Sequence, residues 1–400
     1  MSQPGDQTEI TFLIGKAQSG DAEAQMTLAG RYENGYGVAR DMGLAAHWYL
    51  EAAEQGSVEA QARIGSKYLK GIGIDQDFEK AFYWLRRAAG HDNAEAIADM
   101  GWSYQTGTGT KKDYRKAFSC YERAAALGHV VASFNLGYMY ANGLGTTPDS
   151  AKAMELYLLA AREGNVQAQI NLGEMYAKGI GTAANHIEAV EWFRKAADKG
   201  YAKAQYNLAR MYAEGHGVPE DHAEAARWYT AAAEQGFDRA QFDLGICYLE
   251  GHGVEQNATE AMNWLLKAAF HDYHKARYQI GRIYAEGLGV MESAVEAVNW
   301  FREAAEAGYT RAQYRLGRHY ETGSGVTRDH PTACKWYLKA AQEGFRPAQY
   351  RLGMAYAKGR GVPRDRIEGY AWLYAAAADS DPKALKALHR LCEKLKPEEI

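Results

Sequence analysis

A pair of glycines separated by one residue returns every 36 residues along this chain, and this spacing constrains the fold more than any other feature. A tyrosine stands three residues before each pair, and a residue able to cap a helix stands four residues after it. A fixed period with fixed turn residues is typical of a repeat architecture. The ten pairs are Gly35/Gly37, Gly71/Gly73, Gly107/Gly109, Gly143/Gly145, Gly179/Gly181, Gly215/Gly217, Gly251/Gly253, Gly287/Gly289, Gly323/Gly325 and Gly359/Gly361.

Each repeat is predicted to contain two helices and two turns, as the segment Tyr201–Gly236 illustrates. Its first helix is expected over Ala202–Glu214, where small and apolar residues recur with a period of 3.6 residues. Gly215 is expected to end this helix, because glycine readily adopts the left-handed conformation that closes a helix C-terminus. Asp221 can accept hydrogen bonds from the free N–H groups of the second helix, so it is predicted to be the N-cap.

A tryptophan recurs at one position of the second helix in eight of the repeats. Cys120 and Leu156 replace it in the third and fourth repeats. A large aromatic side chain at a repeated position is predicted to be buried between helices, so we expect Trp228 to be an inter-helix wedge. The series is Trp48, Trp84, Trp192, Trp228, Trp264, Trp300, Trp336 and Trp372.

The pattern A-x-A-Q-x-x-L-G-x-x-Y-x-x-G-x-G-V-x-x-D, followed by A-x-x-W-Y-x-x-A-A-x-x-G, resembles the Sel-one-like repeat, a branch of the tetratricopeptide-like α-solenoids. The resemblance implies an all-α, right-handed superhelical solenoid of ten 36-residue helix–turn–helix repeats, with the first helices on the concave side. The repeats are expected over residues 21–380. Residues 1–20 are predicted to form an N-terminal capping helix, and residues 381–400 a C-terminal capping helix and tail.

The same resemblance implies a non-enzymatic scaffold or adaptor that binds a protein or peptide, in bacteria often around secretion, envelope or signalling functions. The net charge of −4 gives no general attraction to nucleic acid or to an anionic membrane, and no apolar run approaches the length of a membrane span. Two alternatives stay open: a hydrolase similar to the cysteine-rich relatives linked to β-lactams, and a helical-repeat RNA binder. The pattern specifies the fold and not the partner or the oligomeric state.

The cysteines Cys120, Cys247, Cys334 and Cys392 occupy four different repeat positions, so they are expected to be reduced thiols. The apolar stretch Phe12–Ile14 is too short for a secretory signal, so with Met1 as the native start the protein is expected in the cytoplasm.

No metal, cofactor or catalytic site is predicted. His216 and His252 occupy equivalent positions of successive repeats, and helices pack ~8–10 Å apart, which is too far for two imidazoles to share one metal ion. Repeats are expected to bring together only like positions, and no serine–histidine–acid arrangement follows from such spacing.

The partner-binding surface is predicted on the side of each first helix that repeat packing does not use. In the sixth repeat this stripe holds Lys203, Asn207, Arg210 and Glu214. The family resemblance places it on the concave side. The predicted contact residues are Trp102, Asn135, Tyr138, Asn171, Asn207, Arg282, Arg311, Arg315, Arg318 and Arg351.

Two parts of the stripe have both a binding and a packing interpretation. Asn135, Asn171 and Asn207 share one repeat position and could clip the backbone of an extended peptide, or could serve the fold. Trp102 beside Tyr138 could be an interaction hot spot, or could pack over a neighbouring helix. A flanking aromatic run has the same two interpretations: Tyr206, Phe242, Tyr278, Tyr314 and Tyr350.

Arginines gather toward the C-terminal end of the stripe. Arg311, Arg315 and Arg318 lie at i, i+4 and i+7 on one helix face, and Arg351 extends the charge into the next repeat. These groups could hold an acidic segment or a C-terminal carboxylate of a partner, because arginine forks bind carboxylates through paired hydrogen bonds. Alternatively they could pair with Glu286 or Glu321 of this chain, as Arg282 could with Glu286.

The fold prediction can be checked by circular dichroism. The far-ultraviolet spectrum is expected to be that of a predominantly helical protein with essentially no strand, because the glycine pairs are too regular for anything but repeated turns. A clear strand contribution would contradict the repeat assignment.

Overall fold

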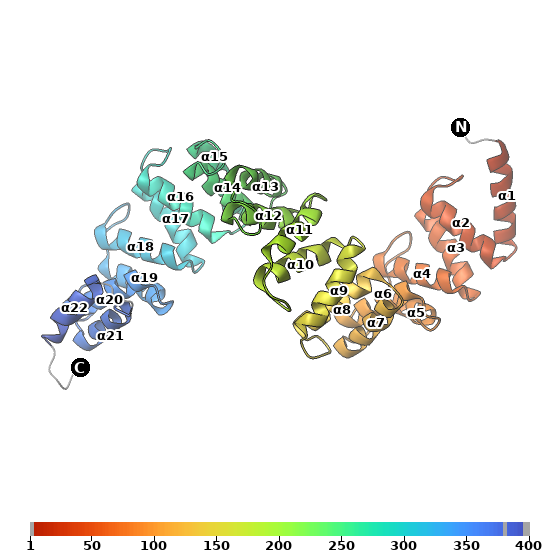
Figure 1. The fold of residues 1–400 in the computed structure, drawn as a ribbon, viewed down its shortest axis with the longest axis horizontal. Helices are drawn as coiled ribbons and strands as arrows, with labels where there is room; N and C mark the ends of the chain where they lie inside the picture. The colour runs from red at the N-terminus through yellow and green to blue at the C-terminus, as the bar shows by residue number, and fades with distance from the viewer. Residues whose placement is uncertain (1–3, 379–381, 395–400) are drawn as a thin grey trace. The chain divides into compact units, whose positions relative to one another are not determined.

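The computed structural model describes residues 4–378 and 382–394, and within these ranges the chain forms 22 helices and no strand (Figure 1). It divides into two compact units, Met1–Ala196 and Ala197–Ile400. The helices of the first unit are α1 (Pro4–Gln18), α2 (Ala22–Asn34), α3 (Met42–Glu54), α4 (Val58–Lys70), α5 (Phe78–Ala89), α6 (Ala94–Thr106), α7 (Tyr114–Ala126), α8 (Val130–Asn142), α9 (Ser150–Arg162), α10 (Val166–Lys178) and α11 (His186–Ala197).

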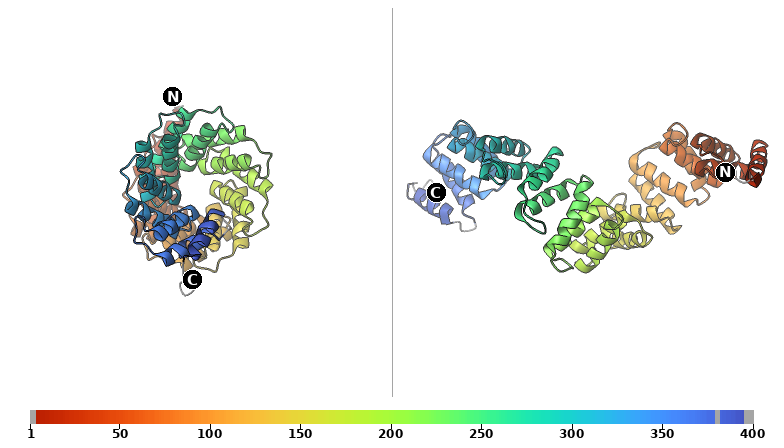
Figure 2. Two further views of the ribbon diagram at one scale, coloured as in Figure 1. Left: turned by 90° about the vertical axis from the view of Figure 1, so that its left-hand side faces the viewer. Right: turned by 90° about the horizontal axis from the view of Figure 1, so that it is seen from above.

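The helices of the second unit are α12 (Ala202–Glu214), α13 (His222–Glu234), α14 (Asp238–Glu250), α15 (Ala258–Phe270), α16 (His274–Glu286), α17 (Ala294–Glu306), α18 (Thr310–Thr322), α19 (His330–Gln342), α20 (Arg346–Lys358), α21 (Arg366–Ala376) and α22 (Pro382–Cys392). Within each unit every helix packs on the next one along the chain, as the two views of Figure 2 show. The tail predicted after the last helix, from residue 395 on, lies outside the described residues.

The turn chemistry predicted from the sequence is confirmed. Both glycines of every pair have positive φ angles, and the first of each pair directly follows the last residue of a first helix. The expected capping residue accepts a hydrogen bond from the start of every second helix, as Asp221 does from the N–H of Glu224 at 2.9 Å. The N–H of Asp221 also donates to the carbonyl of Tyr212 at 3.0 Å, which closes the loop on the helix before it.

The second glycine of most pairs also has a packing role, because it touches the preceding repeat. A Cβ added at Gly253 would lie 1.9 Å from the carbonyl oxygen of His222, the first residue of α13. Gly73, Gly109 and Gly325 meet the backbone of α3, α5 and α17 in the same way. A side chain cannot enter this contact without moving a helix, so glycine is required there for space as well as for its φ angle.

The residue after the tryptophan position is the buried wedge in every repeat, whereas the tryptophans differ among themselves. Trp84 and Trp192 are buried as expected, at 8% and 7% exposure. Trp228 is only half-buried, and its indole N–H donates to Glu224 at 2.8 Å, whereas Tyr229 is 6% exposed, which corrects the expectation for Trp228. Each wedge lies against a small residue of the paired first helix: a Cβ added at Gly281 would be 2.7 Å from the ring of the fully buried Phe301. The other wedges are Tyr49, Leu85, Tyr121, Tyr157, Phe193, Leu265, Tyr337 and Leu373.

Buried glutamines join most second helices to the first helix of the following repeat. The side-chain amide of Gln241 donates to the carbonyl of Ala233 at 3.2 Å, and Gln313 donates to Ala305 in the same way. These carbonyls belong to the last turn of a helix, where the helix itself offers no donor. The same hydrogen bond, from a glutamine to the carbonyl eight residues before it, is made by Gln25, Gln61, Gln169, Gln205 and Gln349.

The first helices begin differently in the two units. In the first unit a side-chain atom of Asp21, Ser57, Asn93, His129 or Asn165 caps each one. In the second unit an aromatic residue stands at the N-cap and makes no capping bond. Four of these rings instead pack on the aromatic run at centroid distances of 5.2–5.3 Å, so that run is repeat core over Tyr206–Tyr314; the pairs are Tyr206–Phe237, Phe242–Tyr273, Tyr278–Tyr309 and Tyr314–Phe345.

Among the described residues, none of the helices combines the length and the apolar character that crossing a lipid bilayer requires.

Replacing Gly253 by alanine is expected to destabilise the second unit more than replacing Gly236. Both glycines have positive φ, which costs an alanine about 1–2 kcal/mol. Only the alanine at position 253 would place its Cβ against the backbone of another helix. That clash adds about 1–3 kcal/mol to the loss in free energy of unfolding. Urea denaturation of the two variants measures the difference, and equal losses would show that the loop glycine does not fix the repeat contact.

Candidate functional site

The stripe of first-helix residues predicted to face a partner lies on the outside of the helix pairs. In α12 the side chains of Lys203, Arg210 and Glu214 are exposed, whereas Leu208 and Ala204 on the other side are fully buried. The predicted division of each first helix into a packing face and an exposed face therefore matches the burial of this helix.

The asparagine position of the stripe points toward the preceding repeat. Asn135 lies within reach of the hydroxyl of Tyr121, which itself donates to Gln105 at 2.8 Å, and Asn171 lies within reach of the hydroxyl of Tyr157. Both tyrosines are wedge residues, buried at 0% and 2% exposure. The packing interpretation of the amides therefore applies to these two. Asn207 is also half-buried, and within the described ranges its Nδ2 atom has no hydrogen-bond partner.

Two carboxylates occupy the same position in other repeats. Asp99 in α6 makes a side-chain hydrogen bond with Ser66, and Asp243 in α14 makes one with Tyr206. Burial disfavours the ionised form, so it raises the pKa of Asp99 to about 6 and also raises the pKa of Asp243. This position therefore belongs to the contact between repeats in most of the chain.

Trp102 and Tyr138 are both exposed, at 40% and 41%. No ring contact joins them in the part of the chain that the structure describes, so the structure places them on one exposed face without bringing them together as a pair. The hydroxyl of Tyr138 lies close enough to Tyr157 to influence its titration, while the carbonyl of Trp102 accepts from Thr106 at 2.9 Å.

Most stripe arginines are paired with an acid on their own helix. Arg210 donates to Glu214 at 2.7 Å and Arg282 contacts Glu286 through two nitrogens, at 3.2 and 3.1 Å. Arg63 pairs with Glu59 at 2.9 Å in the same manner. The pKa values of Arg210 and Arg282 are raised by these hydrogen bonds, so their charge is already compensated within the chain.

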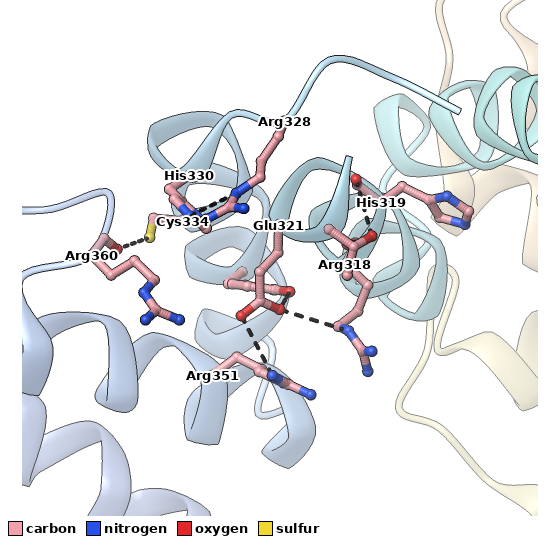
Figure 3. A network of polar contacts seen from close by, with 10 residues as sticks. Arg318, His319, Glu321, Arg328, His330, Cys334, Arg351 and Arg360 are labelled. Carbon is pink, nitrogen blue, oxygen red and sulfur yellow. Dashed lines mark hydrogen bonds and ion pairs between the residues drawn. The ribbon is translucent and has the colours of Figure 1, made fainter. Parts of the chain in front are cut away.

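Glu321 makes one hydrogen bond and two ion pairs at the junction of the last repeats, where Figure 3 shows it between Arg318 and Arg351. It accepts a hydrogen bond from the hydroxyl of Tyr337 at 2.8 Å and lies 3.7 Å from Nε of Arg318. Arg351, from the next repeat, approaches it at 3.4 Å. The pairing with Glu321 that the sequence left open is thus present for Arg318 and Arg351.

Arg311 and Arg315 differ from the other stripe arginines. Both are exposed, lie one turn apart on α18, and form no ion pair with any of the described residues. His319 follows Arg315 by one turn, and its pKa is lowered by burial and then by the charges of Arg315 and Arg318. A neutral imidazole therefore lies one turn along α18 from Arg315.

A pair of histidines was missed by the sequence analysis. His222 and His252 come from unlike repeat positions, yet their rings stack at a centroid distance of 5.3 Å. The contact follows from the loop packing, because Gly253 rests on the backbone of His222 and carries its neighbour His252 alongside. The expectation that repeats bring together only like positions is therefore wrong at this loop. Across the described ranges no three His, Cys, Asp or Glu side chains are grouped to hold a metal ion.

The four cysteines are free thiols. Burial raises the pKa of Cys247 and of Cys334 to about 11, and it also raises the pKa of Cys120. A nucleophilic cysteine needs a lowered pKa, so these three thiols lack the activation that covalent catalysis requires.

Comparison with known proteins places this arrangement among repeat proteins. The Sel1 repeat model matches residues 22–57, 58–93, 94–129, 130–165, 166–201, 202–237, 238–269, 274–309, 310–345 and 346–381. The chain is similar to c5321, a protective antigen of uropathogenic Escherichia coli strains that displays an SLR fold, with 32% identity, a TM-score of 0.86, and coverage of 98% of this chain and 84% of that one.

It is also similar to a Sel1 repeat protein from Oxalobacter formigenes, with 32% identity and a TM-score of 0.66, over 84% of this chain and 93% of the other. No curated protein sequence gives a significant match.

The buried carboxylate of Asp99 predicts a pH dependence of stability. Its pKa of about 6 in the folded state lies above the usual value of 3.8, so the folded protein holds this proton to higher pH than the unfolded chain does. Between about pH 4 and pH 6, rising pH should therefore lower the free energy of unfolding, and the penalty is fully present above about pH 6.

Asp99→Asn is expected to remove this dependence and to stabilise the protein by about 1–3 kcal/mol above that range. Urea unfolding across the pH series tests it, with Asp75→Asn, on an exposed side chain, as the control. A wild-type profile unchanged by Asp99→Asn would contradict the assignment.

Proposed function

Because the chain belongs to the Sel1 repeat family, as its motifs indicated, we propose that it is a non-enzymatic scaffold or adaptor that holds a segment of a partner protein on the exposed stripe of its first helices. Repeat solenoids present extended surfaces built from successive helices, and such surfaces serve to bind other proteins. The partner segment is acidic or ends in a C-terminal carboxylate.

The observation that carries the proposal is the pairing state of the arginines. In α4, α12 and α16 the stripe arginine has an acid one turn away, so the chain neutralises it internally. In α18 neither Arg311 nor Arg315 has such a partner among the described residues. Two like charges one turn apart destabilise a helix by about 0.2–0.5 kcal/mol when no acid offsets them.

A carboxylate from a partner would remove that cost. Guanidinium groups present several N–H donors in a plane that matches the two oxygens of a carboxylate, so the pair can grip an acidic side chain or a chain terminus. Arg318 and Arg351 lie beside them and are held in place by Glu321, which fixes the positions of two further cations on the same surface.

Two observations disfavour the other two functions considered. The raised pKa values of Cys120, Cys247 and Cys334 disfavour a thiol hydrolase. The net charge of −4 disfavours a general nucleic-acid binder.

A cytoplasmic, bacterial setting is also part of the proposal. The free thiols suit a reducing compartment, and the similarity to proteins of Escherichia coli and Oxalobacter formigenes supports a bacterial source.

The proposal predicts which peptides the protein selects. A displayed library of random peptides with free C-termini should be enriched in acidic sequences by the wild-type protein. The double variant Arg311→Glu with Arg315→Glu should lose this enrichment, with affinities for the selected peptides falling about tenfold or more. Binding should also weaken as salt concentration rises.

The matched control reverses two charges on the other helix of the same repeat, Lys335→Glu with Lys339→Glu. These lysines are also exposed and one turn apart, but they lie on α19, outside the stripe. The control should select the same peptides as the wild type. Enrichment of neutral peptides, or acidic peptides that bind the arginine variant at full affinity, would place the contact elsewhere.

A further inference from the structure

A basic hollow lies between the last three helices of the second unit. It has a volume of about 640 Å³ and is lined by residues of α20, α21 and α22 and of the loop that joins the first two of these. We call it the C-terminal basic pocket. Its place in the repeat is the same as that of two other hollows of this unit, one between α12, α13 and α14 and one between α18, α19 and α20.

The charge of the lining sets this pocket apart. Its described lining includes Lys358, Arg364 and Arg366 from one side and a row of four cations from the other side, and it contains no acidic residue. Lys383, Lys386 and Arg390 lie at i, i+3 and i+7 on one face of α22, and Lys394 continues the row just past the end of this helix. The guanidinium of Arg366 donates to the carbonyl of Lys394 at 3.0 Å, which ties this row to α21.

The equivalent hollows are neutralised from within. The hollow beside α12 contains Glu214 and Asp243, and four repeats further along the same two positions hold Lys358 and Ala387 in the C-terminal basic pocket. The hollow beside α18 contains Glu321, which forms ion pairs with Arg318 and Arg351. Of these three hollows, the C-terminal basic pocket is therefore the one whose described lining contains no acidic residue, in a chain whose net charge is −4.

The floor of the pocket is apolar. Leu373 and Leu391 are buried at its base, and the half-buried side chains of Tyr350 and Met354 form one wall. Tyr350, Met354 and Lys358 also line the hollow on the other side of α20, so the two hollows adjoin along this helix. A ligand that fits must bring negative charge for the rim and an apolar group for the floor.

We propose that the C-terminal basic pocket binds an acidic polypeptide segment that carries an apolar side chain, with the carboxylates on the lysines and arginines and the apolar side chain on Leu373, Leu391 and Met354. The identification of the ligand as a polypeptide rests on the proposed function. Single-stranded nucleic acid needs several open aromatic faces on which successive bases stack. In the described lining the only aromatic residue is the half-buried Tyr350, and the floor is formed by Leu373 and Leu391, which favours the peptide.

Fluorescence anisotropy with a defined probe tests the proposal. The probe is a labelled peptide of glutamates with one central phenylalanine, and the full-length protein is titrated against it. Lys386→Glu with Arg390→Glu is expected to weaken binding roughly tenfold or more, because both side chains are exposed and lie one turn apart on the rim. Lys335→Glu with Lys339→Glu, of equal charge change on α19, is expected to leave the affinity unchanged.

Probe chemistry supplies the remaining comparisons. Replacing the phenylalanine of the probe by glutamate should weaken binding, because the apolar floor is left unused. An oligonucleotide of equal charge that binds as tightly, and loses affinity in the same variant, would overturn the assignment to a peptide. So would a rise in probe affinity on replacing Glu398 and Glu399 by glutamine, since the chain's own acidic residues would then be the occupant.

The two proposals fail separately. If the α18 variant with Arg311→Glu and Arg315→Glu selects peptides like the wild type while the α22 variant loses the probe, the stripe proposal is wrong and the pocket stands. If the α22 variant keeps the probe at full affinity, the pocket proposal is wrong whatever the α18 variant does.

Discussion

The contact between one repeat and the next is the constraint on which the rest of this structure depends. The second glycine of most loops presses on the preceding second helix, and at most junctions a buried glutamine ties the end of that helix to the following first helix. Neither contact uses the outer side of the first helix. The exposed positions of that side, such as those of Lys203 and Arg210, can therefore vary from repeat to repeat without cost to the fold, whereas the half-buried Asn135 position takes part in the contact between repeats.

The elements of this fold could be predicted from the sequence because their causes are local. Gly215 ends α12 through its own φ angle, and Asp221 caps α13 through a bond to a residue three positions away. What could not be predicted depends on contacts between elements. The wedge is Tyr229 and not Trp228, because the helix pair brings the second of these two aromatic positions over a small residue. His222 meets His252 because a loop rests on an earlier helix.

The candidate binding surface shows the same division. The sequence placed Arg311, Arg315 and Arg318 on one face, but it could not show that Arg318 shares Glu321 with Arg351 while the other two are left without an acid in the described part of the chain. Nor could it show that Asn135 and Asn171 lie within reach of the hydroxyls of wedge tyrosines. The basic pocket of α20 to α22 was missed for the same reason, since its rim comes from three helices and its distinguishing feature is the absence of acids among its lining residues.

The central claim is that a partner binds where exposed cations such as Arg311, Arg315, Lys386 and Arg390 have no acidic partner among the described residues. Photo-crosslinking maps this directly: the phenylalanine of the glutamate probe is replaced by a photoreactive benzophenone analogue, and mass spectrometry locates the adducts on the full-length chain. The account predicts adducts confined to α18, α20, α21 and α22, and their loss at high salt. Adducts concentrated on α4 to α16, where the stripe arginines already have acidic partners, would contradict it.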